Sequence, residues 1–78
     1  MIDYSRFVGC ESSWLHSYYY DSAESALYVR FKNKKGRLTV TCRYDEIPLG
    51  VWMGLILASS KGEFFHNSGL ILWPYKIV

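Results

Sequence analysis

The sequence has little of what a secreted or membrane-spanning protein needs. It contains two cysteines, too few for a disulfide scaffold. Residues 1–9 include Asp3 and Arg6, where a signal peptide requires an apolar stretch. The longest apolar run, residues 47–58, is interrupted by a proline and two glycines and is too short to cross a bilayer. We therefore expect a cytoplasmic protein with reduced thiols and no membrane partner.

A large excess of one charge is also missing. Nine basic and seven acidic residues give a net charge of +2, far below that of a dedicated nucleic-acid-binding protein. The hydrophobic content of 50% excludes a disordered chain, and 78 residues predict a single domain over residues 1–78. Seven Tyr, four Phe and three Trp are more rings than so small a core needs. We therefore expect some rings on the surface.

The residue types that carry catalysis or hold metals form no recognisable pattern. The spacing of the two cysteines and two histidines matches no zinc site. Ser60 and Lys61 are adjacent, but a lysine at a helix end is expected to cap carbonyl groups rather than to activate a serine. Glycine-rich phosphate loops and paired-carboxylate motifs are lacking. The sequence predicts no catalytic residue, no metal, no cofactor and no enzyme activity.

Alternation of apolar and polar residues predicts antiparallel strands. Residues 14–20 are rich in aromatic side chains, and residues 26–32 and 37–44 alternate regularly. The polar segment 33–36 ends in glycine and predicts a tight turn, so the second and third strands form a hairpin. Five apolar side chains of this hairpin are expected on the face that a helix covers: Leu27, Val29, Phe31, Leu38 and Val40.

The second half of the chain predicts a helix and a last strand. Pro48 suits the first turn of a helix that runs to about Ser60, where Lys61 and a glycine follow. Residues 70–78 predict a strand that Pro74 places at a sheet edge. The predicted fold is α+β: a three-strand antiparallel meander, one helix packed on one face, and a final strand.

Several motifs in this order resemble the KTSC domain family. They are Ser12-Ser13, Tyr20-Asp21, the alternating Leu27, Val29 and Phe31, then Tyr44, Pro48 and the run Ala58-x-Ser60-Lys61-Gly62-x-x-Phe65. This small module is similar to a C-terminal extension of some lysyl-tRNA synthetases and also occurs alone in bacterial and phage proteins. The resemblance implies RNA binding, and a location in the cytoplasm of a bacterial or phage-infected cell.

The first functional hypothesis places nucleic acid on the hairpin. Six of the nine basic residues fall there. If Lys32 lies opposite Arg37, the polar side chains of the two strands share one sheet face. The predicted contacts with single-stranded RNA, or with a nucleic-acid–protein complex, are Tyr28, Arg30, Lys32, Lys34, Lys35, Arg37 and Arg43.

Rings are expected on the same face. If Tyr20 pairs with Ala26, then Trp14, His16 and Tyr18 lie beside the cations, where rings stack bases and cations follow phosphates. A slip of one residue would instead turn these side chains into the core. The alternative is that solvent-facing strand positions favour Tyr, Thr, Arg and Lys in any case.

The second hypothesis places a protein on the helix. Residues 49–58 have almost no polar side, and Gly50 and Gly54 would let another backbone approach. The predicted partner contacts are Trp52, Met53 and Ile56. They would serve a homodimer, or docking on a host protein or defence complex by an inhibitor encoded by a phage or mobile element. The alternative is that four rings of the C-terminal region wrap the helix within the monomer: Phe64, Phe65, Trp73 and Tyr75.

Overall fold

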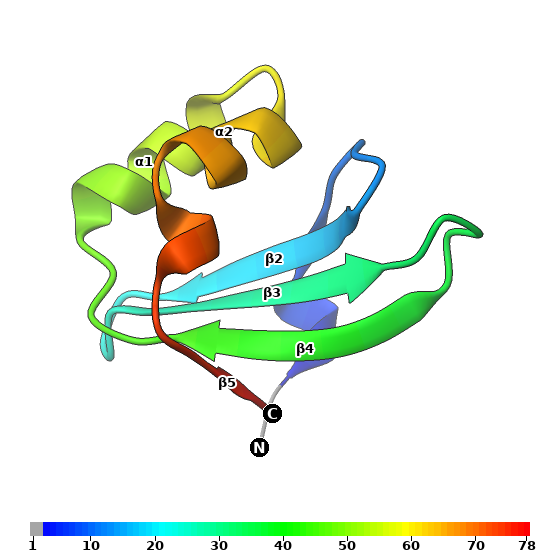
Figure 1. Ribbon diagram of the computed structural model, residues 1–78. Coiled ribbons are helices and arrows are strands. Elements are labelled where there is room, and N and C mark those ends of the chain that lie inside the picture. The colour runs from blue at the N-terminus through cyan, green and yellow to red at the C-terminus, as the bar shows by residue number, and fades with distance from the viewer. Residues whose placement is uncertain (1–2) are drawn as a thin grey trace.

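Five antiparallel strands form one sheet, and two helices cover one of its faces (Figure 1). The structure is a computed structural model that describes residues 3–78. In sheet and chain order, the strands are β1 Val8–Gly9, β2 Leu15–Asp21, β3 Ala26–Lys32, β4 Leu38–Tyr44 and β5 Tyr75–Ile77. The helices are α1 Leu49–Leu57 and α2 Lys61–Asn67, and the 3₁₀ turns are η1 Tyr4–Arg6 and η2 Leu70–Leu72. The α+β class is as predicted, with one strand and one helix more than expected.

The extra helix arises where the sequence predicted the end of a single helix. α1 begins directly after Pro48, as the proline predicts, and ends at Leu57, after which Ala58 is extended. The hydroxyl oxygen of Ser60 then accepts a hydrogen bond from the backbone N–H of Glu63 at 3.3 Å. Because a serine in this position satisfies an N–H that the helix leaves free, Ser60 begins α2 rather than ending α1.

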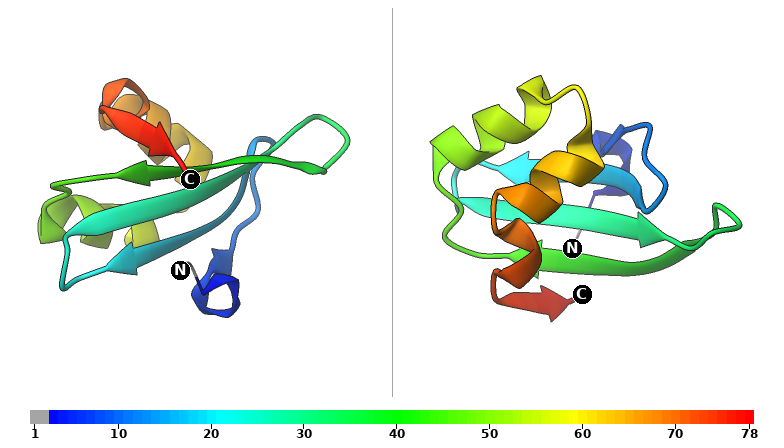
Figure 2. Two further views of the ribbon diagram at one scale, coloured as in Figure 1. Left: turned by 90° about the horizontal axis from the view of Figure 1, so that it is seen from below. Right: turned by 45° about the horizontal axis from the view of Figure 1, so that its top comes forward.

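The core lies between the helices and one face of the sheet (Figure 2). Phe65 of α2 is almost fully buried, with two rings from the sheet and one from the residue before β2 packed edge-on against it. The centroids of the Trp14, Phe31 and Tyr44 rings lie 5.4 to 5.9 Å from the Phe65 ring. These contacts fix α2 over the middle strands of the sheet.

The first long strand is shifted by one residue from the expected register. Tyr20 pairs with Leu27 rather than with Ala26. The carboxylate of Asp21 accepts a hydrogen bond from the N–H of Ala23 at 3.0 Å and closes a four-residue turn, which makes Asp21 the last paired residue. The shift turns Tyr18 into the core and Tyr19 outward, so the expectation for Tyr18 is wrong.

Trp14, which directly precedes β2, also lies on the helix side of the sheet, where the prediction had it outside. Its ring stacks on Phe31 at 5.7 Å and meets Phe65 edge-on. His16 lies where the pairing is irregular between Leu15 and Ser17, and its Nδ1 is 2.9 Å from the Ser17 hydroxyl. Neither residue therefore joins the expected row of rings.

The hairpin of β3 and β4 forms as predicted, but its outer half projects past the helices (Figures 1 and 2). The expected pair of Lys32 with Arg37 is wrong, because a bulge places Lys32 opposite Leu38. Leu38 and Val40 are 46% and 40% exposed, so the expectation that a helix buries them is also wrong. The helices cover only the half of the hairpin that is distant from its turn.

We predict that two leucines of this hairpin differ sharply in their effect on stability. Leu27→Ala removes a fully buried side chain and should lower the free energy of unfolding by about 2–5 kcal/mol. Leu38→Ala should cost less than about 1 kcal/mol, because half of the side chain is already in water. Urea denaturation measures both, and equal losses would show that the outer half of the hairpin is covered.

Candidate binding surfaces

The outer face of the sheet, opposite the helices, is covered by the N-terminal segment. The guanidinium carbon of Arg30 lies 4.4 Å from the centroid of the Tyr4 ring. The Phe7 ring lies 5.8 Å from that of Tyr19 and 6.4 Å from that of Tyr28. Cations and rings do gather on this face, but they contact one another within the chain. This cover was not predicted from the sequence, where the spacing of three between Tyr4 and Phe7 is its signal.

Arg43 is also held by neighbours in the chain. Its Nη1 donates to the Tyr28 hydroxyl at 2.7 Å, and its Nε donates to the Asp45 carboxylate at 2.7 Å. Glu24 completes the ion pair at 3.3 Å. The hydrogen bond to Asp45 raises the pKa of the guanidinium. Three of the predicted RNA contacts, Tyr28, Arg30 and Arg43, are therefore engaged inside the domain.

The other four predicted RNA contacts lie around the hairpin turn. Lys34, Lys35 and Arg37 are exposed, Lys32 is half-buried, and none of them forms an ion pair with another residue of the described range 3–78. Six basic and no acidic residues fall between positions 25 and 44, in a protein whose net charge is only +2. The hairpin therefore carries a concentrated positive charge that the net charge conceals.

The helix surface differs in part from the one predicted. Trp52 and Ile56 are half-buried and pack against the core, whereas Met53 is 45% exposed. Leu49 and Leu57, which the sequence analysis did not select, are 60% and 78% exposed. Since residues four apart share a helix face, Leu49, Met53 and Leu57 form one row, which we call the α1 stripe. Because nearly every side chain of α1 is apolar, the spacing of four alone does not distinguish this row from Trp52 and Ile56.

The two glycines of α1 have different surroundings. A Cβ atom on Gly54 would lie 2.7 Å from the ring of Phe64, so this glycine allows α2 to approach α1. A Cβ atom on Gly50 would meet nothing within 4 Å. Only Gly50 leaves space for another molecule.

The run from Ala58 to Phe65 builds the junction of the helices with the sheet. The ammonium group of Lys61 donates to the carbonyl oxygens of Ile56 at 3.0 Å and Ala58 at 2.6 Å, which confirms the predicted capping role. A Cβ atom on Gly62 would lie 2.7 Å from Nε1 of Trp14. These residues satisfy backbone groups and permit close packing, and their contacts account for the spacing of the run.

The side chains that could act as nucleophiles or bind a metal do not come together at one place in the described residues. Burial raises the pKa of the Cys10 and Cys42 thiols, which disfavours the reactive thiolate form of both. Within residues 3–78, no three His, Cys, Asp or Glu side chains come together as a metal site would require. The helices of this range are also too short to span a bilayer.

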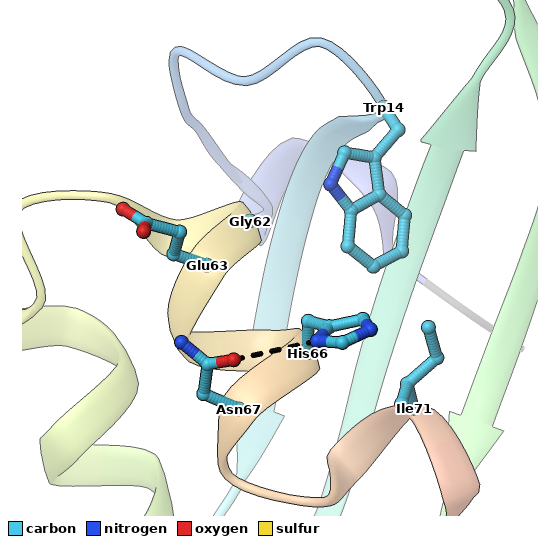
Figure 3. A pocket seen from close by; sticks show the side chains of 6 residues that line it. All are labelled: Trp14, Gly62, Glu63, His66, Asn67 and Ile71. Atoms are coloured by element: carbon cyan, nitrogen blue, oxygen red, sulfur yellow. Dashed lines mark hydrogen bonds between the residues drawn. The ribbon is translucent and has the colours of Figure 1, made fainter.

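Two hollows meet on the helix side of the sheet. The first, of about 390 Å³, lies beside α2 and is lined by Trp14, Gly62, Glu63, His66, Asn67 and Ile71 (Figure 3). The second, of about 230 Å³, shares Trp14 and Ile71 and continues over the sheet to Val40 and Ile77. Nδ1 of His66 lies 3.3 Å from Oδ1 of Asn67 at the polar end. We call the two hollows together the helix-side groove.

The sequence model of the KTSC domain matches residues 11–68. This chain belongs to the KTSC domain family. The crystal structure of a KTSC domain protein from Yersinia pestis is similar, with a TM-score of 0.76 and 24% sequence identity over 92% of this chain and 94% of that one. At this identity the likeness concerns the fold. No curated protein matches the chain.

We predict opposite effects of the same substitution at two helical glycines of this KTSC domain. Gly62→Ala should lower the free energy of unfolding by about 1–3 kcal/mol, because the new methyl group clashes with the Trp14 ring. Gly50→Ala should raise it by up to about 1 kcal/mol, because alanine favours the helix and the site is open. Thermal unfolding monitored by circular dichroism tests this, and a stable Gly62→Ala variant would contradict the packing described.

Proposed function

We propose that this KTSC domain is a non-enzymatic module that docks on a partner protein through the α1 stripe. The observation that carries the proposal is the exposure of Leu49, Met53 and Leu57 on a helix with no charged or polar side chain. A helix that lies on a sheet needs one apolar side only, whereas α1 has a second apolar side that is exposed. Contiguous exposed apolar surface is typical of protein interfaces.

The contacts that α1 makes within the domain show which of its side chains are available to a partner protein. Trp52 stacks on Tyr20 at 5.2 Å and meets Tyr18 edge-on at 5.5 Å, so its ring already holds α1 to the sheet. Of the partner contacts predicted from the sequence, Met53 is the one that is exposed, at 45%. We therefore place the centre of the interface at Met53, with a leucine on each side.

The ring contacts within the domain support RNA binding less than the exposed α1 stripe supports docking on a protein. The rings that would stack on bases are Tyr19 and Tyr28, and both pack against Phe7. What favours RNA is the positive charge of the hairpin turn, which suits phosphate contacts but offers no base readout. Docking on a protein requires no chemistry from the domain itself, and it is the way in which an inhibitor encoded by a phage or mobile element would act on a host protein.

We predict that Met53→Lys together with Leu57→Lys abolishes partner capture without unfolding the domain. Both side chains are exposed, so the change in unfolding free energy should stay within about 1 kcal/mol. The measurement is affinity capture from a nuclease-treated bacterial lysate, compared with the unchanged protein. Lys34→Glu, at the hairpin turn, is the matched control and should retain the partner. Identical captured proteins for all three forms would refute the proposal.

We predict only weak binding of single-stranded RNA. Four hairpin cations give a slope of log affinity against log salt no steeper than about −3, because each phosphate contact contributes about −0.7. Tyr28→Phe should leave the affinity unchanged, since this ring is buried. Fluorescence anisotropy with an oligouridine measures both quantities. A steeper slope, or a loss of affinity with Tyr28→Phe, would favour RNA binding on the outer face of the sheet.

A further inference from the structure

The first hollow of the helix-side groove combines an aromatic ring, an aliphatic side chain and polar groups. Its volume of about 390 Å³ falls within the range of clefts that bind small ligands. Figure 3 shows the indole of Trp14 above the imidazole of His66, with Ile71 beside both. The Trp14 ring also stacks on Phe31 at 5.7 Å, which holds it in place. A ring that enters the hollow would therefore contact a fixed aromatic side chain and an aliphatic one.

A hydrogen bond determines which nitrogen of His66 is available to a ligand. Nδ1 lies 3.3 Å from Oδ1 of Asn67, and Nδ1 is the donor because an amide oxygen only accepts. In the neutral imidazole, Nε2 is then an acceptor. Figure 3 shows Nε2 turned away from Asn67, toward the space between Trp14 and Ile71. Within residues 3–78, the bond to Asn67 is the hydrogen bond that this ring makes, so Nε2 is left for a donor from outside the domain.

The second hollow extends the groove with apolar side chains. Trp14 and Ile71 line both hollows, and the second one reaches Val40 and Ile77, which are 40% and 67% exposed. The buried ring of Phe65 lines it as well. Residues two apart in an extended segment point to the same side. One segment can therefore direct a ring into the first hollow and an aliphatic side chain into the second.

We propose that the helix-side groove binds an extended segment of a partner protein, with a tryptophan or tyrosine side chain in the first hollow and an aliphatic side chain two residues away in the second. The indole N–H or phenol O–H donates to Nε2 of His66, and the ring packs against Trp14 and Ile71. Asn67 is a positioning residue, because it holds the imidazole in the accepting form. The α1 stripe does not line this groove, so the inference does not rest on the proposed function.

The charge and the hydrogen-bonding groups of the groove favour this occupant over two others. Glu63 lines the first hollow, and no lysine or arginine of the described residues lines either hollow. A nucleotide would bring its phosphate near this carboxylate without a cation to balance the two charges. A phenylalanine side chain would fill the hollow, but it would cover Nε2 of His66 without giving it a hydrogen bond. A neutral ring with an N–H or O–H meets both conditions.

The first test changes the ligand. The probe is the tripeptide acetyl-Trp-Gly-Val-amide, and its affinity is measured from the changes in the backbone amide chemical shifts of the isotope-labelled protein. Methylation of the indole nitrogen of the probe should weaken binding at least about fivefold, because it removes the N–H that donates to His66. Phenylalanine in place of tryptophan should have a similar effect. Equal affinity of the methylated and unmethylated probes would overturn the inference.

The second test removes the acceptor from the protein. His66→Phe keeps a ring at this exposed position and should weaken the tryptophan probe at least about fivefold. The methylated probe should bind the variant and the unchanged protein within about twofold of each other, because both changes remove the same hydrogen bond. Asn67→Ala should likewise weaken the tryptophan probe and spare the methylated one, which a purely structural role would not do. Losses that add up for the methylated probe would overturn the assignment.

The third test concerns the apolar contacts and the kind of occupant. Ile71→Lys should weaken both probes, and Met53→Lys, on the α1 stripe, should weaken neither, which separates a failure here from a failure of the proposed function. Binding that ignores Ile71→Lys would overturn the inference. Free indole that binds as tightly as the tripeptide would show that the groove takes a small molecule rather than a protein segment. Displacement of the tripeptide by oligouridine would assign the groove to RNA instead.

Discussion

The packing of one ring, Phe65, determines how the rest of the domain is arranged. It meets rings from the end of the loop before β2, from β3 and from β4, and so joins α2 to three parts of the sheet at once. With α2 fixed in this way, Lys61 reaches the carbonyls of Ile56 and Ala58 at the end of α1, and Gly62 lies against Trp14. In a domain that buries only about 60% of its unfolded surface, such a multiple contact contributes more than an isolated one.

Because the helices pack closely at this junction, they leave apolar side chains of the hairpin and of α1 exposed. Two short helices and η2 cannot extend over a hairpin of seven-residue strands, so Leu38 and Val40 remain in water. α1 packs on the sheet through Trp52 and leaves its opposite side free. The apolar surfaces available to partners therefore follow from how few elements the chain has, and they differ in character. One is the α1 stripe, and the other consists of Leu38 and Val40 on the outer half of the hairpin.

Local patterns in the sequence predicted the features that depend on neighbours in the chain. The hairpin turn at Asn33, the helix start after Pro48 and the capping by Lys61 are all of this kind. The register of β2 was missed by one residue, because it depends on whether Asp21 closes the turn or lies within it. In a sheet with period two, that single residue exchanged the faces of Tyr18 and Tyr19.

The cover of the outer face by Tyr4 and Phe7 involves contacts between distant segments, which no local pattern reveals. The three tryptophans lie in three different regions of such contacts, where their fluorescence can be measured. Trp14 lines the helix-side groove, Trp52 lies between α1 and the sheet, and Trp73 donates its indole N–H to the carbonyl of Asp45 at 2.9 Å. Each indole thus reports on a different contact region, and the protein carries intrinsic fluorescent probes of groove occupancy, helix docking and C-terminal packing without any added label.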